Sequence, residues 1–325
     1  MVSSSKRTRV SIAALLAVFA WASSAEAQQA QGFAVDRLYL SAPGAGWVVM
    51  DALDMRGGLG GAAAMSVGYA RAPLQVTSRD GAQRLTVVSK QASANFGFAV
   101  TYDRWRLYLD ADMPFVISGT SGTVDGYQYV APPVDIGTNP DTLSDPRIGF
   151  DARLVGDATS PFRLGAGAQL FVPNGNRSDY DTDGTYRAMG RVLVAGDVGL
   201  LTYAGHVGVH VRPLDDSPVA GSPRGSEMIF GAAAGPRILV GPGKTALVVG
   251  PEIYGATAFR SFFSSKGTAL EGLLSGRLEG TADDGPQLRV KLGTGVGVNH
   301  HFGAPEWRLV FVIELFDRHA ETPHR

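Results

Sequence analysis

The chain has 325 residues, 29 Lys and Arg against 30 Asp and Glu, a formal net charge of −1 and no cysteine. The near-neutral charge argues against nucleic-acid binding, and the lack of thiols excludes disulfides, thiol catalysis, cysteine-bound zinc and a lipid anchor on cysteine. Forty-two glycines and only 9% aromatic residues disfavour a helix-rich enzyme or helical membrane protein, and suit a β chain with alternating apolar and polar residues.

The chain begins with the pattern of a secretory signal peptide. Basic residues precede an apolar run from Ile12 to Ala22, and a small-x-small site follows at Ala25–Ala27. This pattern predicts a leader over residues 1–27, because the apolar run is too short to span a bilayer. Its removal takes away three of the 29 basic and one of the 30 acidic residues, and leaves a net charge of −3.

Residues 186–213 form a long apolar stretch with two possible structures, a membrane helix or a pair of strands. A membrane helix would place Arg191, Asp197 and two histidines inside the bilayer, where ionisable groups are costly. When the stretch is split at Gly199-Leu200, apolar and polar residues instead alternate with a period of two, as they do in strands. The stretch therefore predicts a hairpin with one apolar, tyrosine-edged face and one charged face.

The same alternation recurs along the chain and predicts twelve strands, an even number as in bacterial outer-membrane barrels. The first, eighth and ninth strands have the weakest alternation. The predicted strands are Met65–Val76, Ala92–Tyr102, Trp105–Phe115, Asp145–Leu154, Pro161–Val172, Tyr186–Val198, Leu201–Arg212, Glu227–Gly235, Thr245–Phe259, Leu270–Glu279, Gln287–Val298 and Glu306–Phe316. We expect residues 28–64 to form an N-terminal periplasmic segment, 65–316 the barrel and 317–325 a C-terminal tail.

The connections between these strands alternate in length. The long ones are 78–90, 119–144, 173–185, 213–224, 260–267 and 299–305, and the short ones are 103–104, 156–160, 199–200, 240–244 and 280–285. Transmembrane barrels show this alternation because their periplasmic turns are tight while their outer loops are free to grow.

A soluble β domain and a membrane barrel differ in which face of the strands meets water. In a soluble exported β domain the apolar face points inward, whereas in a membrane barrel it faces lipid. Aromatic residues near the strand ends resemble interfacial girdles. They are Tyr102, Trp105, Phe162, Tyr186, Tyr203, Trp307 and Phe316. The polar face mixes Arg with Asp and Glu and has little Lys, which favours an antiparallel up-and-down transmembrane β-barrel of the outer-membrane type.

In that barrel the charged face lines the interior, and Arg outnumbers the acids. The expected pore-lining residues are Arg106, Asp110, Asp112, Arg147, Asp151, Arg153, Arg163, Arg187, Arg191, Asp197, Arg277, Arg289, Lys291, Arg308 and Glu314. Two interpretations stay open. The side chains can cross the lumen as salt bridges that stiffen and plug it, or they can line a narrow, mildly anion-preferring pore.

Four stretches together resemble the N-terminal barrel module of modular OmpA-family outer-membrane proteins. They are WVVMDALDMRG (47–57), AGAQLFVPNGNRSDYDTDGTYRAMGRVLVAGDVG (166–199), GSEMIFGAAAGPRI (225–238) and LVVGPEIYGAT (247–257). The likeness covers most of residues 33–316. It implies a barrel without catalytic residues, whose last strand ends in an aromatic residue, as at Phe316, that the barrel-insertion machinery reads. The acidic calcium repeats and peptidoglycan-binding domain typical of the family do not follow.

Two short motifs have stronger ordinary interpretations. Asp179, Asp181 and Asp183 have the spacing that opens a calcium loop, but the twelfth position is Gly190 instead of Glu, so they are only a weak metal candidate and Asx turns are favoured. GPGKT at 241–245 lacks the first glycine of a phosphate loop and predicts a turn.

The expected function is that of a structural or porin-like protein of the outer membrane, monomeric and without cofactor, metal or enzymatic activity. A narrow pore would pass small, mildly anionic solutes. The expected partners are outer-membrane lipid and lipopolysaccharide, and the barrel-assembly machinery during insertion, with no nucleic acid. Two alternatives remain: a surface interaction or adhesion protein that uses the long outer loops, and a soluble exported β domain.

Overall fold

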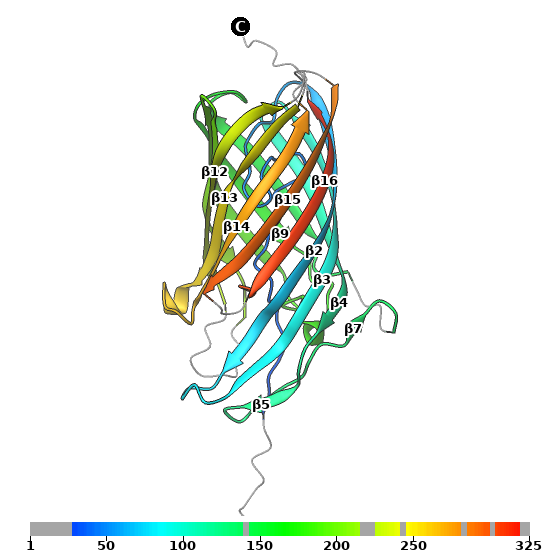
Figure 1. Cartoon of the computed structure of the whole chain (residues 1–325), viewed down its shortest axis with the longest axis vertical. Coiled ribbons are helices and arrows are strands. Elements are labelled where there is room, and N and C mark those ends of the chain that lie inside the picture. The colour runs from blue at the N-terminus through cyan, green and yellow to red at the C-terminus, as the bar shows by residue number, and fades with distance from the viewer. Residues whose placement is uncertain are drawn as a thin grey trace, which may run out of the picture.

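A computed structural model describes residues 28–138, 143–214, 225–240, 245–280, 285–299 and 303–318. The expected signal peptide lies outside the described residues. In the described part of the chain, twelve long strands form one closed antiparallel barrel, in which each strand pairs with its sequence neighbour in the wall and β16 closes on β2 (Figure 1). No helix in these ranges is long and apolar enough to cross a membrane.

The twelve wall strands match the twelve predicted from the alternation, with shifted ends. They are β2 (Leu59–Thr77), β3 (Arg84–Tyr102), β4 (Trp105–Ser118), β8 (Arg147–Val155), β9 (Arg163–Phe171), β10 (Arg187–Val198), β11 (Leu201–Val211), β12 (Glu227–Val240), β13 (Thr245–Ala258), β14 (Thr268–Gly280), β15 (Gly285–Asn299) and β16 (Trp307–Arg318). The largest shift is at β3, which begins at Arg84, so the first connection is much shorter than the predicted 78–90.

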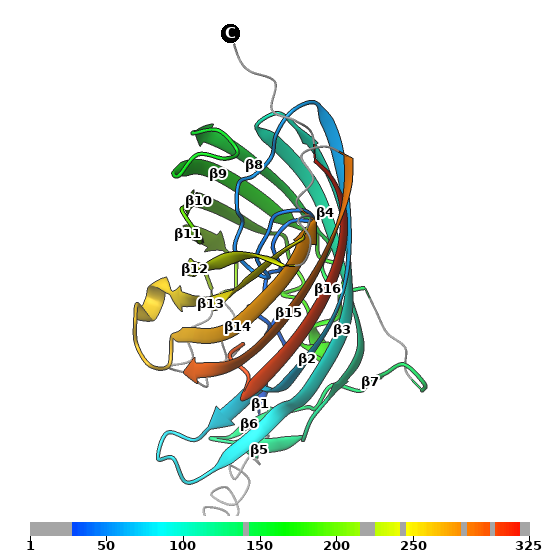
Figure 2. The ribbon, with the colours of Figure 1, turned by 45° about the horizontal axis from the view of Figure 1, so that its top comes forward.

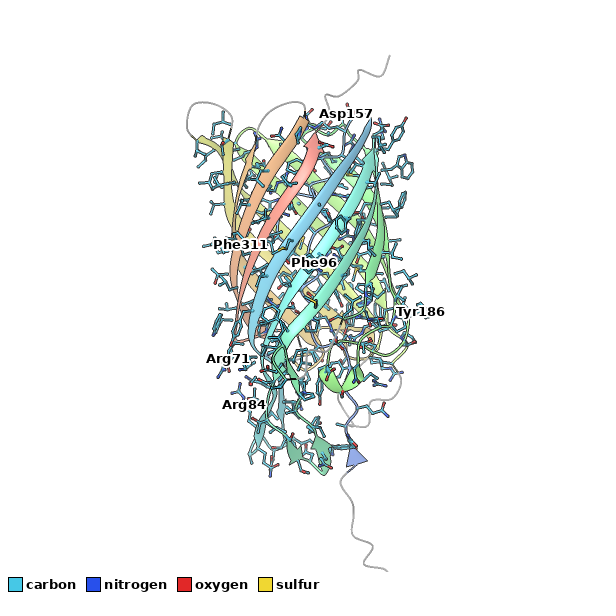
Figure 3. The ribbon with its side chains drawn as sticks, turned by 90° about the vertical axis from the view of Figure 1, so that its right-hand side faces the viewer. Arg71, Arg84, Phe96, Asp157, Tyr186 and Phe311 are labelled. Atoms are coloured by element: carbon cyan, nitrogen blue, oxygen red, sulfur yellow. The ribbon has the colours of Figure 1, made fainter. Side chains whose placement is uncertain are left out.

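The wall turns its apolar parity outward and its charged parity inward. Phe98, Val192 and Leu292 are 62%, 49% and 52% exposed, whereas Arg191 and Arg289 are 7% and 1% exposed. Phe96 and Phe311 project from the outside of the wall (Figure 3). An apolar outer surface cannot be the wetted face of a soluble β domain. The expectation of a transmembrane barrel is therefore confirmed, and the soluble alternative is wrong.

Among the connections that the structure describes in full, short and long ones lie at opposite ends of the barrel. The tight turns β3–β4, β8–β9 and β10–β11 lie at one end, where Asp157 is found, and the β2–β3 hairpin extends past the other end to Arg84 (Figure 3). Gly199, in the two-residue β10–β11 turn, has a φ of +60°, which favours glycine. Because outer-membrane barrels keep tight turns on the periplasmic side, the hairpin end is the outer end.

The long β4–β8 connection carries three further short strands at the outer end. They are β5 (Gly122–Val124), β6 (Tyr127–Tyr129) and β7 (Val134–Asp135). The first strand of the described chain, β1 (Gln28–Gln29), pairs in parallel with β6. Buried apolar residues such as Phe33, Val87 and Tyr129 hold this outer layer together.

Residues 28–64 were expected to form a periplasmic segment. The structure instead places most of this segment inside the barrel. It starts beside β6 at the outer end, runs through the barrel interior and leaves at the short-turn end, where β2 begins (Figures 1 and 2). We call residues 30–56 the plug. Its apolar side chains, including Trp47, Met50 and Leu53, are almost fully buried against the inner wall, which explains why this stretch does not remain in water.

Candidate functional site: the occupied lumen

The plug crosses the lumen without joining the wall as a strand. The wall closes through β16 and β2, while the plug pairs with itself in one isolated bridge between Gly46 and Asp51. A backbone enclosed in a barrel still needs hydrogen-bond partners. The plug supplies some of them itself, as in Ser41 N to Val48 O at 2.9 Å, and charged side chains of the wall supply others.

Glu252 of β13 supplies acceptors to three consecutive backbone N–H groups. Its carboxylate accepts from Val48 at 2.9 Å, Val49 at 2.8 Å and Met50 at 3.2 Å. The Glu252 side chain is 1% exposed, and charge-assisted bonds of this kind are stronger than neutral ones. This carboxylate is therefore the main anchor for the middle of the plug.

Cationic side chains of the wall donate hydrogen bonds to carbonyl groups of the plug. Lys291 donates to Trp47 O at 2.9 Å, Arg147 to Leu40 O at 2.8 Å and Arg163 to Ala52 O at 3.0 Å. Arg153 donates to the carbonyls of Leu53 and Met55. These contacts are distributed along the plug, which fixes its path without a regular ladder.

A buried ion cluster joins the plug to the wall at mid-lumen. Asp51 of the plug lies 2.8 Å from Arg191 Nη2 and 3.4 Å from Arg106 Nη2. Both guanidinium groups also contact Asp151, at 3.1 and 3.6 Å. Tyr108 completes the cluster by accepting from Arg191 at 3.2 Å. Two wall cations thus share one carboxylate of the plug and one of the wall.

A second cluster holds the plug at the outer end. Arg37 contacts Glu227 at 2.8 Å, and Glu227 also contacts Arg212 at 2.7 Å. Arg212 contacts Asp183 at 2.6 Å, and Asp183 accepts from Ala34 N at 2.9 Å. Burial raises the pKa of Asp183, but Arg212 outweighs this and holds it at about 2, so Asp183 stays ionised at neutral pH.

The predicted interior residues all come from the inward parity of the wall. Thirteen of the fifteen are buried, and Asp112 and Asp197 are partly exposed. They do not line an open pore in this structure, because most of them contact the plug or each other. Arg163 pairs with Asp197 at 2.8 Å and Arg289 with Glu314 at 3.2 Å. Both the salt-bridged lumen and the segment filling it contribute to closure.

Phe316 and the aspartates of the third outer connection differ from expectation. Phe316 is 7% exposed and lies beneath Arg289, 4.3 Å from guanidinium carbon to ring centroid, so its ring faces the lumen and is not part of an outer girdle. Asp183 pairs with Arg212, while Asp181 accepts from Asn176 N at 3.1 Å. Among the described residues, no group of three or more His, Asp or Glu is placed to hold a metal ion.

Several lumen residues were missed by the sequence pattern. Glu252 was hidden because β13 alternates poorly: its inward side carries Val248 and Tyr254, which pack against the plug. Leu273 and Val312 are likewise apolar residues on a charged parity. Apolar residues on the inner face were therefore the available signal for a segment inside the barrel.

Together, fold and site define a transmembrane β-barrel of the outer-membrane type whose lumen is occupied by its own N-terminal segment. No family model matches the chain, and no curated protein matches it. Among solved structures, an outer membrane channel from Pseudomonas putida F1 is similar, with a TM-score of 0.48 and 14% identity over 80% of this chain and 96% of that chain. The β domain of the Bordetella autotransporter BrkA has a TM-score of 0.37 and 13% identity, over 78% and 98%.

A further similar structure is the outer membrane channel DcaP of Acinetobacter baumannii, with a TM-score of 0.28 and 12% identity, over 79% of this chain and 96% of that chain. The strand pairing and the outward apolar face, described above, carry the assignment of the fold.

Proposed function

We propose that the protein is a narrow porin-like channel of the outer membrane, which the plug closes and which favours small anionic solutes when the plug leaves. The observation that carries this proposal is the way the plug is held. Its bonds to the wall run from side chains to backbone or between side chains, so it can leave without breaking a wall strand pair.

The charges of the lumen support a preference for anions. Among the described wall strands, ten buried cations face seven buried acids. The cations are Arg106, Arg147, Arg153, Arg163, Arg187, Arg191, Arg277, Arg289, Lys291 and Arg308, and the acids are Asp110, Asp151, Glu227, Glu252, Glu271, Glu279 and Glu314.

The plug adds three carboxylates that contact these cations. Asp36 lies 2.8 Å from Arg308, and Asp54 lies 3.8 Å from Arg289, while Asp51 contacts the mid-lumen arginines. Departure of the plug therefore leaves several arginines with fewer acidic partners, and a basic constriction selects anions.

The resemblance to the barrel module of the OmpA family belongs to this proposal, as does the lack of enzymatic activity. Outer-membrane lipid, lipopolysaccharide and the barrel-assembly machinery are the partners that such a protein would meet, and we propose a monomer. A second role, as a surface interaction protein, is favoured by the β4–β8 connection, which projects beyond the wall with Ile136 63% exposed (Figure 2).

Planar-bilayer recording tests the channel. We expect the intact protein to conduct rarely, and a variant lacking residues 30–56 to give steady conductance steps with a reversal potential that indicates anion preference in a salt gradient. Heat-modifiable gel mobility confirms that the variant is a folded barrel. Ser275→Ala, a lumen substitution that removes only a contact with Gly250 O of the wall, is the matched control and should behave as the intact protein does. Silence of the folded deletion variant at every voltage would refute the proposal.

A further inference from the structure

The plug does not fill the outer half of the lumen. A cavity of about 120 Å³ remains between the plug and the wall formed by β2, β3 and β4. A water molecule needs roughly 10–15 Å³ of such volume, so the cavity has room for on the order of ten water-sized groups. That is the size range of a small sugar or polyol.

The wall of this cavity differs from the rest of the lumen. Ser66, Asn95 and Asp112 are direct cross-strand partners on β2, β3 and β4, and all three line the cavity. Neighbours on one face of a sheet lie about 5 Å apart. Gln91 and Ser93 extend this polar strip on β3. The strip consists mainly of uncharged groups that both donate and accept hydrogen bonds.

Polar groups on this surface lack protein partners. Within the described part of the chain, no hydrogen bond joins the side chain of Ser66, Gln91 or Asn95 to another residue, although Ser66 and Gln91 are only 5% and 8% exposed. Arg147, 4% exposed and also lining the cavity, has one nitrogen, Nη1, without an acceptor. Polar side chains that face a cavity and have no protein partner favour a ligand that supplies one.

The charged residues of the cavity are mostly neutralised within the protein. Arg147 pairs with Asp110 at 2.8 Å and Arg187 with Asp145 at 2.9 Å, and Arg308 pairs with Asp36 of the plug. An anion would compete with these carboxylates, and a cation with these guanidinium groups. Asp112, which faces Ser93 and Ser144, offers a carboxylate to adjacent hydroxyl groups of a neutral ligand.

We propose that this cavity is a binding site for a small, neutral, hydroxyl-rich solute of the sugar or polyol class. Ser66, Gln91, Asn95 and Asp112 bond its hydroxyl groups. The site exists while the plug is in place, so this inference goes beyond the proposed channel and does not require the lumen to open.

Binding to the intact chain in detergent micelles tests the site. Saturation-transfer NMR with D-glucose should give saturable signals, with gluconate and glucosamine as the anionic and cationic counterparts of similar size. We expect glucose to bind more tightly than both. Asn95→Leu, which keeps the volume but removes both polar atoms, should weaken glucose binding about tenfold, and Ser275→Ala should leave it unchanged.

The variant lacking residues 30–56 separates this site from the channel. This variant loses the side of the cavity that the plug forms, and we expect it to lose glucose binding whether or not it conducts ions. Absence of saturable glucose binding to the intact protein overturns the inference, and so does tighter binding of gluconate or glucosamine, or equal binding to folded Asn95→Leu. None of these outcomes depends on whether the deletion variant conducts, so failure here and failure of the channel proposal are distinguishable.

Discussion

Removal of the Glu252 carboxylate should release the plug from the wall. In Glu252→Ala the N–H groups of Val48, Val49 and Met50 lose their shared acceptor. A hydrogen bond to a charged group contributes about 1.5–3 kcal/mol. Because the three bonds share one carboxylate, we count them as two bonds of about 1.5 kcal/mol each. Loss of the carboxylate then favours the released plug by about 3 kcal/mol, or roughly a hundredfold in the opening equilibrium.

Thiol labelling measures this equilibrium directly, because the natural chain has no cysteine. Ala45 of the plug is 0% exposed, so Ala45→Cys gives a single buried reporter. When closing is faster than labelling, the labelling rate is proportional to the open population. We expect Glu252→Ala to raise this rate roughly a hundredfold, and Glu252→Gln, which keeps one acceptor oxygen, to raise it less.

Ser275→Ala in the same reporter background is the control. Ser275 is 3% exposed on β14 and its hydroxyl faces Gly250 O, so the substitution changes the lumen wall without removing any of the hydrogen bonds or ion pairs described above between wall and plug. An unchanged labelling rate in folded Glu252→Ala would refute the view that this carboxylate anchors the plug.

Further predictions concern the outer end and the plug tryptophan. Asp183→Asn should weaken the contact with Arg212. Because the pKa of Asp183 is held at about 2, its contribution to the stability of the closed plug persists above about pH 4 and is lost as pH falls through 2. Reporter labelling measured against pH would show this loss. Burial, followed by neighbouring acids, raises the pKa of Asp181 to about 7. The outer loop that holds Asp181 should therefore be most stable in acid and lose stability as pH rises through 7, so limited proteolysis should be faster at pH 8 than at pH 6, and Asp181→Asn should remove that difference. Trp47 packs under Arg277, 4.8 Å from guanidinium carbon to ring centroid, and iodide should quench its fluorescence more in Glu252→Ala than in the intact protein; equal quenching would contradict release.

The wall was predictable from the sequence because most strands have lipid on one side and charged or polar groups on the other. The strict alternation around Val192 and Arg191 is a direct consequence of that environment. The weaker alternation of β13 has a physical cause, since Val248 and Tyr254 face the apolar plug instead of water. Strand ends moved because β2 and β3 continue beyond the wall as a hairpin, where lipid no longer imposes a pattern.

The plug was not predictable in the same way because its backbone has no repeating partner. The acceptor for Val48 N is Glu252, 204 residues away, and no local period reports such a contact. In the sequence alone, the charges of the plug, including Asp36 and Asp51, indicate a segment in water. Only the fold shows that arginines of the wall face them. The sequence pattern thus located the lumen cations and some of their partners on the wall, such as Asp151 and Glu314, but not the carboxylates that the plug supplies.

The size of the barrel explains why a segment of chain, and not side chains alone, occupies the lumen. An eight-stranded barrel is just wide enough for its own side chains to fill, and the interior widens as strands are added. With twelve strands, Arg106 and Arg191 meet a carboxylate from the plug as well as Asp151 from the wall. A buried cation without a partner is costly, so the plug both fills space and neutralises charge. The same two roles make its departure the step that would open the lumen and leave it basic.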